Sequence, residues 1–161
     1  MRDERRMDTL EKWKVEACER LKHAWIRGVV AGLDEVDEET ARKFLERCGE
    51  ACAKSWLEFY GYDPASYTLD SWIKLLNELE PGVRNVKRKG DSVIYELKRE
   101  QCVCPLVSEN VVELTPKLCS ACATNFFKHI FKNAAKRPVR VEVMESHATG
   151  ADKCVFRIWL Q

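Results

Sequence analysis

The sequence predicts an α+β fold in which N-terminal helices pack on an antiparallel sheet built from two hairpins, with a long helix between them. Two observations support this class. Apolar residues recur every three or four positions through the first half of the chain, which is typical of amphipathic helices. From Val83 onward, apolar and polar residues alternate in short runs joined by turn residues, which is typical of antiparallel strands.

A single domain, 1–161, is expected, because no linker-like or repetitive segment interrupts the chain. The change of period divides it into a mainly helical part, 1–82, and a hairpin–helix–hairpin part, 83–161. The helical part holds three predicted helices. The first covers about residues 3–31 and is amphipathic, with Trp13, Ala17, Leu21 and Trp25 among the residues of its apolar face.

The second helix is expected to follow the N-cap residue Asp37 and to end before Gly61. We expect one of its faces to be apolar and turned inward. That face consists of Phe44, Cys48, Ala51, Cys52, Trp56 and Phe59. A third, shorter helix is expected over about residues 69–79, after the N-cap residue Thr68.

The first hairpin pairs residues 83–89 with 92–99, and residues 101–107 continue or follow its second strand. Thr115 and Pro116 then have the types preferred at the N-cap and at the first position of a helix. This long helix is expected to run to about Ala135. The second hairpin pairs a strand that opens at Pro138 with the last strand, 153–160.

The charge composition limits the classes of partner. The chain has 27 Lys and Arg residues against 26 Asp and Glu residues, for a net charge of +1. This balance gives no electrostatic reason to expect nucleic acid or an acidic membrane as partner. The first twenty residues are highly charged and no long apolar segment follows, so we expect no secretory signal and no membrane span. We therefore expect a cytoplasmic protein.

Seven of the eight cysteines stand out, because three short groups and one C-terminal residue contain them all. They are Cys48-Gly-Glu-Ala-Cys52, Cys102-Val-Cys104, Cys119-Ser-Ala-Cys122 and Cys154. In a reducing compartment, such cysteines indicate free thiols, a metal site or a reactive site rather than a disulfide framework. Cys18 has no short-range partner in the sequence, and we interpret it as a packing residue.

Four of these sulfurs form the expected metal site. If residues 102–104 are extended, Cys102 and Cys104 point to the same side. Cys119 and Cys122 are three residues apart at the start of a helix and share one face. Four thiolates so placed suit zinc or an iron–sulfur cluster, which are the expected cofactors. The alternative is that they are small buried apolar side chains.

The other three grouped cysteines are reserve ligands or core residues. Cys48 and Cys52 lie one turn apart on the second helix, and Cys154 lies on the inward face of the last strand. Aromatic side chains nearby are expected to line a ligand pocket, although aromatics at helical spacing are more often core. The pocket residues are Trp56, Phe126 and Phe156.

The same thiols could serve catalysis. A helix N-terminus lowers the pKa of a thiol, so Cys119 is one candidate nucleophile, and Cys104 is the other. His129 follows Cys122 by seven residues and could assist a thiolate, although such a histidine is more often exposed or packed. Whether the chain is an enzyme stays open, because the spacing reveals no Cys–His–Asn or Cys–His–Asp arrangement.

The last sixty residues carry four motifs that together resemble a known family. They are C-x-C-P-L-V (102–107), L-T-P-x-L-C (114–119), P-V-x-V-E-x-x-E-S (138–146) and G-x-x-x-C-x-F-x-I (150–158). The pattern resembles the 4-vinyl reductase, or hydrocarbon-binding, domain family. It is also similar to a related group of uncharacterised cysteine-rich proteins near L-2-amino-thiazoline-4-carboxylate hydrolase.

The resemblance implies the ligand-binding fold of nitric-oxide haem sensors and Golgi transport particle subunits. In that fold, helices and an antiparallel sheet enclose a small-molecule pocket, and family cysteines are associated with a metal. The axial-histidine motif of the haem sensors is not apparent in this sequence, so haem is not implied.

Three functions follow from these observations. The first is a small-molecule-binding or sensor module with a cysteine-ligated zinc or iron–sulfur site. The second is a cysteine- or metal-dependent, hydrolase-like enzyme that acts on a small organic substrate. The third is a non-catalytic interaction protein. The expected partner is a small molecule, which the resemblance implies to be hydrophobic. A homodimer is compatible with each of the three hypotheses.

Overall fold

The computed structural model describes residues 2–98 and 102–161, and it confirms the α+β class. The helices are α1 (Arg2–Gly32), α2 (Glu38–Tyr60), α3 (Leu69–Leu79), α4 (Pro105–Ser108) and α5 (Thr124–Ala135), with a π-helical segment, η2 (Leu118–Ala123), before α5. The strands are β1 (Val83–Lys89), β2 (Ser92–Leu97), β3 (Val139–Glu145) and β4 (Val155–Leu160). Short 3₁₀ turns occur at Pro64–Ser66 and His147–Thr149.

The four strands form one antiparallel sheet in the order β1-β2-β4-β3, so the two predicted hairpins lie side by side. The first hairpin turns at Gly90, whose φ of 59° is the left-handed value that glycine adopts without strain. The hairpins join through β2 and β4, where Tyr95 pairs with Phe156. The last strand of each hairpin therefore lies at the centre of the sheet.

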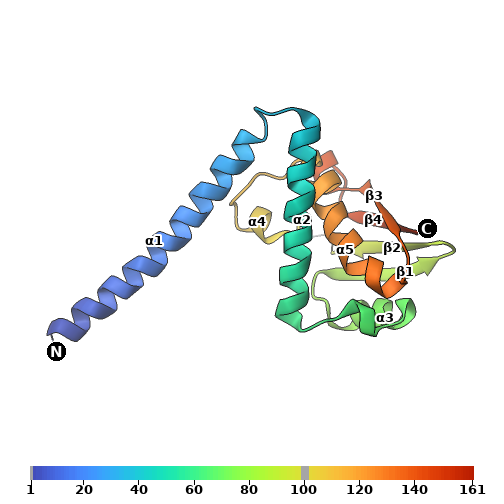
Figure 1. Ribbon diagram of the computed structural model, residues 1–161, viewed down its shortest axis with the longest axis horizontal. Helices are drawn as coiled ribbons and strands as arrows, with labels where there is room; N and C mark the ends of the chain where they lie inside the picture. The colour runs from blue at the N-terminus through green and yellow to red at the C-terminus, as the bar shows by residue number, and fades with distance from the viewer. Residues whose placement is uncertain (1, 99–101) are drawn as a thin grey trace.

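α5 covers one face of this sheet, and α2 packs against α5 and η2 (Figure 1). The core lies between α5 and the central strands. The Phe127 ring centroid lies 4.6 Å from that of Tyr95 on β2 and 4.4 Å from that of Phe156 on β4. Ile130 and Phe131, on the same face of α5, are fully buried. Burial of this apolar face, recurring at three- and four-residue steps, holds α5 on the sheet.

The two edges of the sheet differ. The side chain of Asn77 on α3 donates to the carbonyl oxygen of Val86 at 2.7 Å and accepts from its backbone N–H at 2.8 Å. α3 therefore covers the β1 edge and satisfies backbone groups that a free edge would expose. β3 forms the opposite edge and lies beside η2 and α5.

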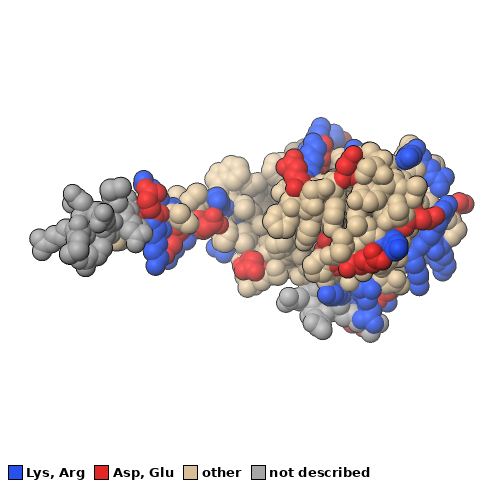
Figure 2. Space-filling model, turned by 90° about the horizontal axis from the view of Figure 1, so that it is seen from below, with Lys and Arg blue, Asp and Glu red and all other residues tan. Residues whose placement is uncertain are grey.

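The expected packing of the first helix on the sheet is wrong. α1 projects from the body as a free-standing helix (Figures 1 and 2), and Trp13, Leu21 and Trp25 are 64%, 69% and 74% exposed. Its C-terminal end touches the body, where the Arg27 guanidinium donates to the carbonyl oxygens of Asn110 and Val111. No helix within the described residues has the length and apolar character needed to cross a membrane.

The expected inward face of the second helix is only partly correct, because Trp56 packs on the core while most of the other residues of that face are exposed. The buried ridge of α2 is Ala41, Leu45, Gly49 and Ala53. The neighbouring ridge is largely exposed: Phe44 is 43% and Phe59 82% exposed, and Cys52 is exposed as well. α2 therefore carries two adjacent apolar ridges, and the helix layer covers only the one with the smaller side chains.

The structure differs from two predictions in the C-terminal half, the extended segment at 102–104 and the regular α-helix after Thr115. Residues 102–104 are irregular rather than extended in a strand, and Pro105 opens the short helix α4. Thr115 does cap the next helix, since its hydroxyl accepts from the Leu118 N–H at 3.2 Å, but residues 118–123 are π-helical. The strand prediction for 101–107 fails where Pro105 starts a turn of helix, and residue 101 lies outside the described residues.

Candidate functional site: a cluster of thiols

Seven cysteines meet at one end of the fold. Cys48 and Cys52 come from α2, Cys119 and Cys122 from η2, Cys102 and Cys104 from the segment before α4, and Cys154 from the position just before β4. All eight cysteines lie within the described residues and are free thiols. Those that converge are close enough for the charge of one thiolate to raise the pKa of another.

The cluster has two parts. The Cys119 group comprises Cys102, Cys104, Cys119 and Cys154, and the Cys122 group comprises Cys48, Cys52 and Cys122. Cys104 interacts with Cys119 and also with Cys122, so it borders both groups. The structure therefore brings all seven grouped cysteines together, including the three that the sequence placed in reserve.

Cys119 is buried, and its sulfur accepts a hydrogen bond from the hydroxyl of Ser146 at 3.3 Å. Ser146 is itself 1% exposed, and its oxygen also accepts from the Ala148 N–H. Burial raises the pKa of the Cys119 thiol, and the Ser146 hydrogen bond only partly opposes that effect. The expected lowering of this pKa by a helix N-terminus is wrong, because desolvation dominates at this position.

The Cys122 group contains a thiol whose pKa is lowered, that of Cys52. A hydrogen bond from the thiol of Cys122 lowers the pKa of Cys52 to about 7, against the opposing effect of burial. The same hydrogen bond, with burial, raises the pKa of Cys122. The pair therefore shares one proton that stays on Cys122, and Cys52 has the character of an exposed, activated thiolate.

A close approach of two backbones sets this geometry. Gly49 is a buried residue of α2, and a Cβ atom there would lie 2.1 Å from the carbonyl oxygen of Cys122. One turn later along the adjoining helix, the side-chain amide of Asn125 donates to the carbonyl oxygen of Glu46. These contacts hold η2 against α2 and so fix the sulfur of Cys122 beside that of Cys52.

The Cys52 thiolate yields a pH-dependent prediction. In dilute protein, the alkylation rate of Cys52 is expected to rise to a plateau with a midpoint near pH 7. Cys122→Ala removes the hydrogen bond, so the midpoint moves upward and less Cys52 is thiolate at pH 7. The rate at pH 7 falls only about three- to fivefold, because the more basic thiolate is also more nucleophilic. Iodoacetamide labelling followed by peptide mass spectrometry measures both quantities.

Cys122→Ser is the matched control for this prediction, because a serine hydroxyl can still donate to the Cys52 thiolate. The midpoint in Cys122→Ser is expected to stay near that of the unsubstituted protein. Equal midpoints in the Cys122→Ala and unsubstituted proteins would contradict a role for this hydrogen bond.

The four predicted metal ligands do not form one closed set. Cys102, Cys104 and Cys119 belong to one group, whereas Cys122 belongs to the other. Across residues 2–98 and 102–161, no three His, Cys, Asp or Glu side chains converge closely enough to hold a metal ion. The four predicted ligands are therefore divided between the two groups, and Cys104 is the cysteine that lies at the border of both.

The predicted pocket residues lie in packed aromatic surroundings. Trp56 meets Phe126 edge-on, with ring centroids 6.0 Å apart, and Phe156 is 2% exposed against Phe127. All three belong to the main core or pack on its border. His129 pairs with Glu50 on α2 at 3.9 Å rather than with a sulfur, and burial lowers the pKa of its imidazole.

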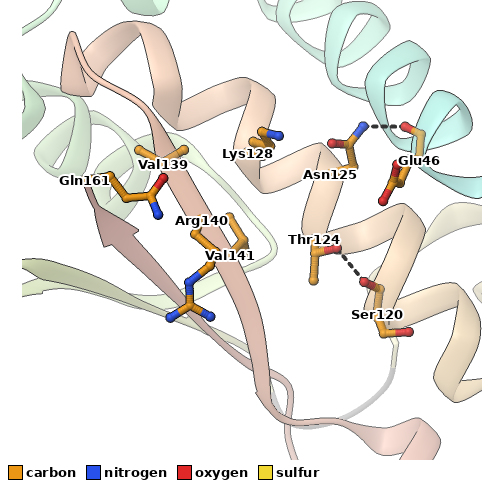
Figure 3. Close-up of a pocket in the computed structure, with 9 residues that line it drawn as sticks. All are labelled: Glu46, Ser120, Thr124, Asn125, Lys128, Val139, Arg140, Val141 and Gln161. Carbon is orange, nitrogen blue, oxygen red and sulfur yellow. Dashed lines mark hydrogen bonds between the residues drawn. The ribbon is translucent and has the colours of Figure 1, made fainter. Parts of the chain in front are cut away.

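A separate hollow lies between the β3 edge, α5 and α2 (Figure 3). Its polar side chains are mostly engaged within the protein. The Thr124 hydroxyl donates to the carbonyl oxygens of Ser120 and Ala121, and Arg140 pairs with Glu142 at 3.1 Å. The thiol cluster, whose reactive atoms have few such partners, is therefore the better candidate site.

Three residues or features of this site escaped the sequence interpretation. Gly49 gives a visible signal, since a glycine within a helix costs about 1 kcal/mol relative to alanine and indicates close packing. The π-helical turn carrying Cys119 and Cys122 leaves no trace in apolar periodicity, although such turns are frequent at functional sites. Ser146 ends a predicted strand, and nothing in its sequence neighbourhood indicates the hydrogen bond to Cys119.

The fold resembles a solved structure. Subunit 3 of a trafficking protein particle complex from Naegleria fowleri, in a crystal structure covalently bound to palmitic acid, superposes with a TM-score of 0.51 at 11% identity. The match covers 88% of this chain and 92% of that subunit. At this identity the likeness concerns the fold alone.

The sequence is similar to one curated protein and matches one family model. The RNA polymerase sigma factor RpoD of Helicobacter pylori is 26% identical over 111 residues, which cover 69% of this chain and 15% of that protein. The model of DUF6144, a family of unknown function, matches residues 14–161, which include every residue of the thiol cluster. The chain therefore belongs to the DUF6144 family.

Proposed function

We propose that this protein is a small-molecule-binding or sensor module whose thiol cluster binds a soft metal ion, either zinc or the iron of an iron–sulfur cluster. The observation that carries the proposal is the convergence of seven free thiols from four separate segments. Core packing alone would not require so many cysteines at one end of the fold. Thiolates are the ligands that zinc and iron–sulfur clusters prefer.

The chemistry of the donor set fits this class of ion, and the thiol cluster offers more sulfurs than one ion needs. Cys102, Cys104 and Cys119 would supply three ligands, and Cys122 or Cys154 the fourth. Among the described residues, no three such side chains lie close enough to hold an ion, so the irregular segment 102–104 would have to move toward η2 when the metal binds. Burial raises the pKa values of Cys102 and Cys119, and the neighbouring thiolates add a smaller effect in the same direction. A bound metal ion would offset both effects, because it stabilises the thiolate form. The bound metal would supply Lewis acidity or an electron-transfer centre.

The metal proposal predicts that one substitution removes binding. Protein purified without added metal is expected to carry stoichiometric zinc, or to show a visible absorption band from iron–sulfur. Cys104→Ser, at the border of both groups, should lower the metal content at least tenfold, since loss of a thiolate ligand is not compensated by a hydroxyl. Elemental analysis and the absorption spectrum measure the result.

Cys18→Ser is the control for this experiment, because Cys18 lies on α1 and outside the thiol cluster. It is expected to retain the metal content of the unsubstituted protein. Metal-free protein after purification under reducing conditions, or full metal retention in Cys104→Ser, would refute the metal site.

A second function, thiol-dependent chemistry, is favoured by one observation: the exposed Cys52 with its pKa lowered to about 7. An activated thiolate can attack the carbonyl carbon of an acyl thioester, so that a new sulfur–carbon bond forms, the old one breaks and the donor's thiolate leaves. The structural neighbour holds palmitic acid covalently, and Cys52 is the thiol through which this chain would hold a comparable hydrophobic acyl group. Metal-free protein with a single fast-reacting Cys52 would favour this function over the metal site.

A further inference from the structure

Two apolar helix faces have no cover in the single chain. The first, named here the α1 stripe, consists of Trp13, Ala17, Leu21 and Trp25 at four-residue steps. A shallow groove runs along this stripe, bordered also by Cys18. The second, named here the α2 ridge, consists of Phe44, Cys48, Cys52 and Phe59. The α1 stripe is an i, i+4 row, the kind of ridge that packs into the grooves of another helix. The α2 ridge follows the same spacing from Phe44 to Cys52 and then passes to Phe59, seven residues later, because Trp56 packs on the core.

The α1 stripe cannot cover the α2 ridge of its own chain in this arrangement. Arg27 binds the carbonyl oxygens of residues 110 and 111, and Ile26 and Val30 on the same side of α1 are partly buried. With 100° per residue, Leu21 lies on roughly the opposite side of the helix from Val30. The stripe is therefore left exposed in the single chain, where another molecule can reach it.

The exposed area decides which surface a second copy would contact. Trp13 and Trp25 on the stripe are 64% and 74% exposed, and Phe44 and Phe59 on the ridge are 43% and 82% exposed. At about 200 Å² per aromatic side chain, covering all four in both copies buries about 1,000 Å², the lower bound for a specific interface. By the same count of aromatic side chains, pairing the α1 stripes with each other would cover only the two tryptophans of each copy, about 550 Å².

The two surfaces also match in length. The α1 stripe extends over thirteen residues and the α2 ridge over sixteen, so they are about 20 Å and about 24 Å long at 1.5 Å per residue. Each has an aromatic ring at either end, with smaller side chains between. A two-fold axis lets the stripe of each copy cover the ridge of the other, so that both faces are used twice.

We propose that this protein forms a two-fold homodimer in which the α1 stripe of each copy packs on the α2 ridge of the other. The arrangement covers Cys48 and Cys52 with the second copy's α1, and it places Cys18 of that helix close to them. The thiol cluster is thereby closed on the side that is open in the single chain.

Sedimentation velocity over a wide range of protein concentrations tests the dimer. A species of twice the 18.7 kDa chain mass is expected, with the alkylation rate of Cys52 falling as the dimer forms. Trp13→Ser and Phe59→Ser should each weaken the dimer at least about 30-fold, since buried aromatic side chains dominate interface energies. A monomer at every concentration would overturn the proposal.

Matched controls separate this interface from general surface effects. Val15→Ser removes a side chain as exposed as Trp13, at 64%, but on another side of α1, and Leu79→Ser removes one that is 56% exposed on α3. Neither should weaken the dimer. A dimer that survives both Trp13→Ser and Phe59→Ser would overturn the proposed interface.

Cross-linking of the native thiols identifies the pairing. A short bis-maleimide followed by peptide mass spectrometry is expected to join Cys18 to Cys48 or Cys52 within the dimer band. Cross-links between the two Cys18 residues, with Phe59→Ser without effect, would instead indicate paired α1 stripes. A Cys18–Cys52 link within single chains would indicate closure of α1 on its own α2. Either result would contradict the exchanged arrangement.

Discussion

Replacing Gly49 with alanine is expected to destabilise the protein by at least about 2 kcal/mol, although alanine favours a helix over glycine by about 1 kcal/mol. A Cβ atom at this position would lie 2.1 Å from the carbonyl oxygen of Cys122 and 3.1 Å from the backbone nitrogen of Phe126. Both contacts are with backbone, which cannot rotate away as a side chain can. α2 and η2 must therefore separate, and denaturant unfolding followed by circular dichroism measures the loss.

Gly28→Ala is the matched control, because Gly28 is also helical and a Cβ atom there has no neighbour within 4 Å. This substitution should leave stability unchanged or raise it. The Gly49→Ala variant should also lose the low pKa of Cys52, since the hydrogen bond from Cys122 depends on the close approach. Equal stability of the two variants would show that the contact between α2 and η2 carries no strain.

Gly49 also explains why the buried face of α2 was predicted wrongly. The buried ridge is built of Ala41, Leu45, Gly49 and Ala53, whereas the neighbouring ridge carries Phe44 and Phe59. Apolar periodicity weights a ridge by the size of its side chains, so it selects the ridge with the aromatic residues. The close approach of η2 requires small side chains instead, and that requirement is visible only in three dimensions.

Local signals were interpreted correctly because their physics is local. Asp37 and Thr68 cap α2 and α3 as expected, since each side chain accepts from a backbone N–H three residues later. The hairpin turn at Gly90 likewise follows from the glycine in the sequence. The alternating strands were placed well because one face of the sheet is buried.

The convergence of the cysteines is a tertiary property that spacing anticipates only within each group. Cys52 and Cys122 are seventy residues apart, and only the packing of η2 on α2 brings their sulfurs into hydrogen-bond contact. The π-helical turn shifts the register of η2 by one residue relative to an α-helix, which the sequence does not reveal. The packing of separate elements, which no short sequence motif encodes, therefore brings the reserve ligands Cys48, Cys52 and Cys154 to the cluster.

Phe131→Ala is expected to lower the free energy of unfolding by about 3–5 kcal/mol, the range for removing a fully buried aromatic side chain. Phe131 has no exposed surface, and its ring meets that of Tyr95 edge-on, with centroids 6.1 Å apart. It lies on the face of α5 that packs against β2 and β4, so its loss leaves a cavity between the helix layer and the sheet. Chemical denaturation measures the change.

Two comparisons test this explanation. Phe131→Leu keeps most of the apolar volume and should cost about 1.5 kcal/mol or less, and Leu79→Ala, at an exposed position on α3, should change stability by less than about 0.5 kcal/mol. Because Phe131 is nine residues beyond Cys122, more than two helical turns away, the Cys52 alkylation midpoint should stay near pH 7 in folded Phe131→Ala. A stability loss as small as that of Phe131→Leu would mean that the layers close over the cavity.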